Sequence, residues 1–109
     1  MFWIKEVSLL AKNLNLSEEQ FTTTFQSRLG ANKWLEPATE KTVQSFAGKN
    51  IAVVCPSFIV DCLETLEEIN IEIRNTFKEF KGNDLTYISC LNDTDKWIKD
   101  FGSYLQKKA

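Results

Sequence analysis

One stretch of this chain constrains its fold more than any other, because an apolar run, a tight turn and a long helical pattern follow one another directly. Residues 51–54 are apolar and mostly β-branched, which predicts a buried strand. Pro56 and Ser57 then mark a turn. From Ile59 to Phe80 apolar residues recur every three or four positions, the spacing of one helix face. A strand, turn and helix in this order predict a site at the carboxyl edge of a parallel sheet.

The remaining segments alternate in the same way. Residues 3–14 have apolar positions at helical spacing, residues 21–26 are β-branched and aromatic, and Pro37 with Thr39 starts a helix to about residue 47. Residues 85–90 form a third strand pattern, and Asn92, Asp93 and Thr94 can cap a last helix. This order predicts a single α/β domain over residues 1–109, a three-layer αβα fold with about three parallel strands covered by helices on both faces.

Composition excludes several classes of protein. The net charge of −2 leaves no basic surface for nucleic acid. No apolar run approaches the roughly 20 residues of a transmembrane segment, and the N-terminus does not resemble a secretory signal. Three cysteines without close pairing do not predict a disulfide framework, so we expect a reducing, cytoplasmic location. The chain contains no histidine.

The long helical pattern carries an acidic row. Glu64, Glu68 and Glu72 are four residues apart and lie beside the apolar stripe. Such a row is either a solvated face, at a cost of about 0.2–0.5 kcal/mol per pair of like charges, or a route for cations and protons. Asp61 and Glu64 also fit a capping box, which is a structural role for both residues.

Three blocks in this order resemble the ferrochelatase family, whose members insert ferrous iron into protoporphyrin to make haem. Residues 54–69 (VCPSFIVDCLETLEEI) resemble the signature segment of that family. Residues 25–30 (FQSRLG), followed by residues 34–37 (WLEP) and Thr39, resemble a second C-terminal motif of the family. Residues 88–93 (ISCLND) resemble its last strand and loop. The similarity runs from about residue 21 to residue 97.

The resemblance implies a role for each of these residues. Glu64 takes the place of the catalytic glutamate, and Glu68 and Glu72 match the acidic row that follows it, as candidate metal contacts. Cys62 occupies a position where many relatives have histidine, so a softer, thiolate ligand stands beside Glu64. The implied porphyrin-binding residues are Gln26, Ser27, Arg28, Trp34, Pro56, Ser57 and Phe58. Packing of Trp34 and a solvated turn at residues 26–28 remain open as structural alternatives.

The resemblance also implies partners and a missing part. The chain matches the second half of the family's sequence, without the first strand of that half-domain or the histidine across the porphyrin from the glutamate. Protoporphyrin IX and ferrous iron are the implied substrates, and no bound cofactor or iron–sulfur cluster is expected. We therefore expect a C-terminal piece of a ferrochelatase that is inactive alone. It would associate with a histidine-bearing N-terminal half or with itself.

Two other classes of function stay open. The chain can be a non-catalytic module that binds porphyrin or haem, or a structural remnant that self-associates through its sheet. A thioredoxin-like redox role is the weakest alternative, because the chain has no Cys-x-x-Cys motif.

Overall fold

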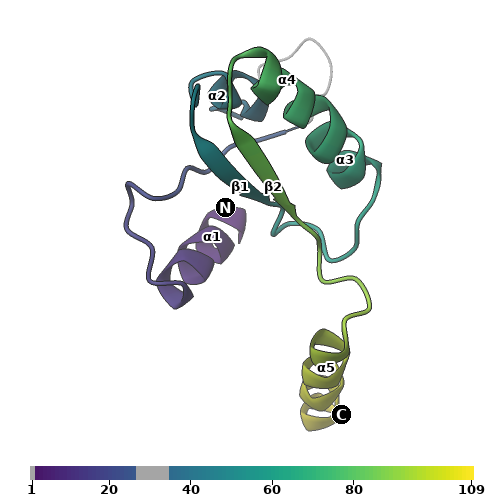
Figure 1. Ribbon diagram of the computed structural model, residues 1–109. Coiled ribbons are helices and arrows are strands. Elements are labelled where there is room, and N and C mark those ends of the chain that lie inside the picture. Colours follow the sequence, from purple (N-terminus) through teal and green to yellow (C-terminus); the bar gives the residue numbers. More distant parts are fainter. Residues whose placement is uncertain (1, 27–34) are drawn as a thin grey trace.

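The computed structural model describes residues 2–26 and 35–109, with side chains from residue 6 onward (Figure 1). Its elements in chain order are α1 (Phe2–Asn13), α2 (Thr39–Val43), β1 (Asn50–Val54), α3 (Leu63–Leu66), the π-helix η1 (Glu68–Ile73), α4 (Arg74–Glu79), β2 (Asp84–Ile88) and α5 (Asp95–Lys108).

The two named strands form a parallel sheet. Asn50 of β1 is opposite Asp84 of β2, and the register continues to Val54 opposite Ile88. Both strands begin and end within two residues of their predicted bounds. Parallel neighbours need a crossover connection, and α3, η1 and α4 supply it. The α/β class and the parallel sheet are therefore confirmed.

The prediction of a strand at residues 21–26 is wrong. In the described residues it is reduced to one parallel bridge, between Phe25 and Ala38. The Phe25 amide donates to the Pro37 carbonyl at 3.0 Å, and the Phe25 carbonyl accepts from the Thr39 amide at 3.0 Å. The backbone of Phe25 thus pairs with the residues that lead into α2. A β-branched and aromatic segment becomes a strand only where it has a partner to pack and pair with.

The core lies on one face of the sheet. Buried side chains of α2, η1, α4 and β2 meet there: Val43, Ile69, Ile73, Phe77 and Leu85. Arg74 fastens the helices to β2 by donating from Nη1 to the Leu85 carbonyl at 2.6 Å. On the opposite face Val54 and Ile88 remain 48% and 44% exposed. Helices were expected on both faces of the sheet, but on this face the side chains of Val54 and Ile88 remain open to solvent.

The long helix begins later than predicted and contains a π segment. It starts at Leu63 rather than Ile59, and the Glu67 carbonyl accepts from the Ile71 amide at 3.2 Å and the Glu72 amide at 2.9 Å. A π turn holds more residues than an α turn, so residues four apart stay aligned. The buried face therefore runs through Thr65, Ile69, Ile73 and Phe77, whereas Leu63 is 71% exposed.

The helices at the two ends contribute little to this core. Among the side chains that the structure describes, neither α1 (from residue 6) nor α5 contributes a residue to it, and α5 extends away from the sheet (Figure 1). The radius of gyration is 15.6 Å, against about 13 Å for a compact domain of this length. Helix α2 stops at Val43, four residues short of its predicted end. The site is thus positioned by the sheet and the crossover helices.

Candidate functional site

The site is built on the turn between β1 and α3. The strand ends at Val54, and the Phe58 amide donates to the Cys55 carbonyl at 3.1 Å to close the turn. Residues 59–62 then stay non-helical because the loop after β2 holds them. The Asn92 amide donates to the Ile59 carbonyl at 2.9 Å, and the Asn92 side-chain oxygen accepts from the Asp61 amide at 2.9 Å. These bonds explain why the helix does not begin at Ile59.

The helix N-terminus differs by one residue from the predicted capping box. Cys62, not Asp61, is the N-cap, and its backbone amide donates to Thr65 Oγ1 at 2.9 Å. Thr65, and not Glu64, is therefore the residue at position N3 whose side chain completes the capping box. Glu64 is released from that structural role.

Asp61 is the centre of a hydrogen-bond network that joins three segments. Its carboxylate accepts from the Tyr87 hydroxyl, from Asn92 Nδ2 at 2.8 Å and from Thr65 Oγ1 at 3.0 Å. The amide of Cys90 also points at it, at 3.5 Å. The network ties the start of α3 to the end of β2. Sequence reasoning treated Asp61 only as a cap, although the polar residues that follow β2 were a signal for partners at the same sheet edge.

This network fixes the charge of Asp61. Hydrogen bonds from Tyr87 and Asn92 hold the pKa of the Asp61 carboxyl well below its usual range. Burial, followed by the bond to Asp61, raises the pKa of the Tyr87 hydroxyl. Tyr87 therefore stays a neutral donor and Asp61 an acceptor. The arrangement places a permanent negative charge beside the first turn of α3.

Glu64 lies on the first turn of α3 and is half-buried. A hydrogen bond from the Cys62 side chain, and then one from its own backbone amide, lower the pKa of the Glu64 carboxyl. The structure therefore places the Cys62 side chain against the Glu64 carboxylate. An ionised carboxylate at this place can attract a cation and accept a proton.

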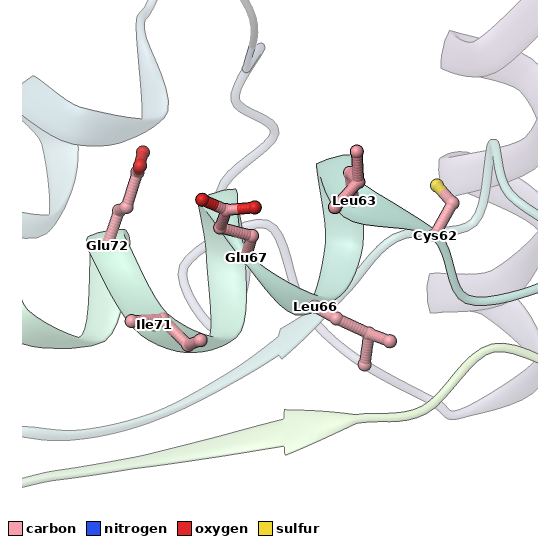
Figure 2. Close-up of a pocket in the computed structure, with 6 residues that line it drawn as sticks. All are labelled: Cys62, Leu63, Leu66, Glu67, Ile71 and Glu72. Carbon is pink, nitrogen blue, oxygen red and sulfur yellow. The ribbon is translucent and has the colours of Figure 1, made fainter.

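The acidic row is split between two environments. Glu68 is half-buried, and its Oε2 is 3.4 Å from the side-chain amide nitrogen of Gln26. Glu72 is exposed and lines an open groove of about 290 Å³ together with Glu67. Figure 2 shows the carboxylates of Glu67 and Glu72 projecting on the same side of the helix. The lining residues of this groove are Cys62, Leu63, Leu66, Glu67, Ile71 and Glu72.

The predicted porphyrin contacts fall into three groups. Pro56 and Ser57 are exposed in the turn after β1, and Phe58 beside them is half-buried. Gln26 turns its amide toward the acidic row instead of toward open solvent. The predicted contacts Ser27, Arg28 and Trp34 lie outside the described residues.

All three cysteines have free thiols. Burial raises the pKa of the Cys55 thiol to about 11 and also raises that of Cys90. Within residues 2–26 and 35–109, no three cysteine or acidic side chains are close enough to hold a metal ion together. Any metal contact through Cys62, Glu64, Glu68 or Glu72 would need further ligands from elsewhere. In the same part of the chain, no helix is long and apolar enough to cross a membrane.

The parallel pair of β1 and β2, joined by the crossover through α3, η1 and α4, defines the class as an α/β protein. The particular family follows from comparison with known proteins: the ferrochelatase family model matches residues 3–109, and the chain belongs to that family.

Curated relatives agree with this assignment. The chain is 52% identical over 98 residues to the ferrochelatase of Herminiimonas arsenicoxydans. This alignment covers 87% of this chain and 27% of that protein. It is 51% identical, with the same coverage, to the ferrochelatase of Janthinobacterium sp. (strain Marseille). It is 44% identical over 100 residues to the ferrochelatase of Bdellovibrio bacteriovorus, or 89% of this chain and 30% of that protein. The chain thus spans less than a third of the length of these relatives. No solved structure matches it.

Proposed function

We propose that this chain supplies the glutamate side of a ferrochelatase site, where ferrous iron enters protoporphyrin IX to form protohaem in haem biosynthesis. The observation that carries the proposal is the placement of Glu64. The proposal is supported by the family match over residues 3–109, by the position of Glu64 on the first turn of α3, and by the hydrogen bonds from the Cys62 side chain and the backbone amide of Glu64 that lower the pKa of its carboxyl. The activity is that of a lyase acting by metal insertion.

The reaction releases two protons, since the two pyrrole N–H groups of the free porphyrin lose them as four nitrogens bind Fe²⁺. Glu64 is proposed to attract the ion and to accept one of these protons. Its lowered pKa favours the first task in the unliganded chain, because an efficient base at neutral pH needs a higher pKa. Approach of the apolar macrocycle would remove water and raise the proton affinity of the carboxylate.

The neighbouring donors are proposed to pass the ion along. Glu68 and Glu72 lie further along the same helix, and Cys62 is next to Glu64. No three acidic or cysteine side chains converge within the described ranges, which favours brief contacts over a resident metal. Iron is therefore proposed to be a substrate and not a resident cofactor. Pro56, Ser57 and Phe58, with Ser27, Arg28 and Trp34, are proposed to contact the porphyrin.

Turnover is proposed to need a histidine from a segment outside these 109 residues. The sequence contains none, and it aligns with 27% of the Herminiimonas protein. Incubation of the purified chain with Fe²⁺ and protoporphyrin under anaerobic conditions is expected to give no haem absorbance above the protein-free rate. Haem formation by the chain alone would contradict this part of the proposal. Three free thiols support a location in the reducing cytoplasm.

A titration with protoporphyrin separates the proposed site from the binding-module alternative. We expect saturable quenching of tryptophan fluorescence and a shifted Soret band, because this chain carries the proposed porphyrin contacts. Porphyrin binding that survives Glu64→Ala but is lost in Trp34→Ala, through loss of stacking, would favour the binding-module alternative. Retained affinity for haem as well as porphyrin, together with no activity alongside any histidine-bearing half, would favour a carrier.

The exposed sheet face supports one further proposal, which is self-association. Val54 and Ile88 remain about half exposed on adjacent strands. An open apolar sheet face is a site for another polypeptide to cover. Sedimentation velocity at several concentrations tests this, and a concentration-independent monomer would contradict it.

A further inference from the structure

Gln26 makes three contacts that join separate parts of the site. Its Nε2 donates to the Glu64 backbone carbonyl at 2.6 Å and is 3.4 Å from Glu68 Oε2. Its Oε1 accepts from the Cys55 thiol at 3.8 Å. One side chain therefore bridges the first turn of α3, the first residue of η1 and the end of β1.

The chemistry of these neighbours fixes which way the amide points. A backbone carbonyl and a carboxylate accept hydrogen bonds only, so the NH₂ group must face both of them. A thiol offers its hydrogen to the amide oxygen. Rotating the amide by half a turn would set oxygen against oxygen on one side. The orientation of Gln26 is thus determined by the site and not by solvent.

The contacts fall at the junction between α and π geometry. Glu64 belongs to α3 and Glu68 opens η1. One residue before Glu68, the Glu67 carbonyl is shared by the Ile71 and Glu72 amides. An added donor on the Glu64 carbonyl stabilises the helix where its own hydrogen-bond pattern changes. Gln26 also has a long reach in sequence, since it lies 38 residues before Glu64 and 42 before Glu68.

We propose that Gln26 is a positioning residue for the acidic row, which holds the Glu64 turn and the Glu68 carboxylate, rather than a porphyrin contact. The proposal deepens the proposed function and rests on it for its catalytic part. The same hydrogen bonds connect Gln26, which directly precedes Ser27 and Arg28 in the sequence, to the helix that carries Glu64. A displacement of Gln26 would therefore displace the Glu64 turn.

Amide hydrogen exchange on the 109-residue chain tests the placement without any activity. Gln26→Met keeps the length of the side chain and removes its donor and acceptor. We expect exchange in residues 64–72 to rise about tenfold, while residues 85–88 stay unchanged, because only local hydrogen bonds are lost. Gln106→Met, at an exposed position of α5, is the matched control. Unchanged exchange in residues 64–72 would overturn the proposal.

Exchanging the side-chain types of Gln26 and Glu68 provides a rescue experiment for the contact between them. Gln26→Glu sets a carboxylate against Glu68 and is expected to loosen residues 64–72. Adding Glu68→Gln restores one donor and one acceptor, and protection should recover in part. If Gln26→Met does not fold, this pair decides the question alone. No recovery in the double variant would refute a direct contact between the two side chains.

Steady-state kinetics separate positioning from porphyrin binding. In a chimera, this chain replaces the matching region of the Herminiimonas arsenicoxydans ferrochelatase. There Gln26→Met is expected to lower kcat about tenfold and to leave KM for protoporphyrin within about twofold. A raised KM with unchanged kcat would make Gln26 a porphyrin contact and overturn the proposal. An inactive parent chimera would count against the proposed function, whereas the exchange experiment would still decide the placement of Gln26.

Discussion

Gly82 gives a sharp test of the core because it lies against the ring of Phe77. A Cβ atom at residue 82 would be 2.3 Å from one ring carbon and 2.4 Å from two others. Phe77 is fully buried, and Ile69, Ile73 and Leu85 belong to the same core cluster. The ring cannot move aside without disturbing that cluster. Gly82→Ala is therefore an overpacking substitution.

The expected magnitude follows from two opposing effects. Overpacking of a well-packed core costs about 1–3 kcal/mol. Replacing glycine by alanine recovers about 0.4–1 kcal/mol through the unfolded chain. The net loss is about 1–2 kcal/mol, which lowers the midpoint of urea unfolding by about 1 M for a small protein. Circular dichroism at 222 nm is the measurement.

Gly102→Ala is the matched control, because nothing lies within 4 Å of its added Cβ and the residue is inside α5. It should increase helicity and should not lower the midpoint. In a Phe77→Ala background the cost of Gly82→Ala should largely disappear. A Gly82→Ala midpoint equal to or above that of the wild type would refute this account of the core.

Three further predictions concern the same core and the network beside it. Phe77→Ala should cost about 3–5 kcal/mol in urea unfolding, enough to unfold much of a small domain, and a loss below about 1 kcal/mol would contradict its central place. Bonds from Tyr87 and its neighbours depress the pKa of Asp61, so they stabilise the fold above the unfolded pKa of about 3.9 and are lost as pH falls toward the folded value. Urea midpoints should therefore fall less with acid in Asp61→Asn than in the wild type, and parallel pH profiles would refute this linkage. With its pKa at about 11, the Cys55 thiol should react with iodoacetamide at pH 8 about a hundredfold more slowly in the folded than in the unfolded chain, and equal rates, measured by mass spectrometry, would contradict its burial.

The sheet was predictable from the sequence because its strands are short apolar runs next to turn residues. Residues 51–54 and 85–90 carry that signal in themselves, and the helical pattern between them requires a parallel pair. Residues 21–26 have the same local signal but do not form a strand, since Phe25 pairs with Pro37 and Thr39 instead. Propensity does not state which partner a segment will find.

The helix that carries Glu64 was predictable in existence but not in detail. Its start moved to Leu63 because Asn92, 31 residues away from Asp61, holds the preceding backbone. The π segment and the role of Gln26 depend equally on contacts between distant residues. Periodicity describes one helix in isolation, so it cannot reveal these effects. Glu64 lies on the first turn of α3 in the structure, whereas its catalytic role remains a prediction.

The most direct test of the proposed function is metal insertion by the chimera with the Herminiimonas arsenicoxydans ferrochelatase. Ferrous iron and protoporphyrin are supplied under anaerobic conditions, and haem formation is followed by absorbance. The parent chimera is expected to form haem, and Glu64→Gln is expected to lose nearly all of that activity. Glu18→Gln is the control, at an exposed residue 46 positions before Glu64, and is expected to retain it. A Glu64→Gln chimera as active as its parent would contradict the assignment of Glu64 as the catalytic carboxylate.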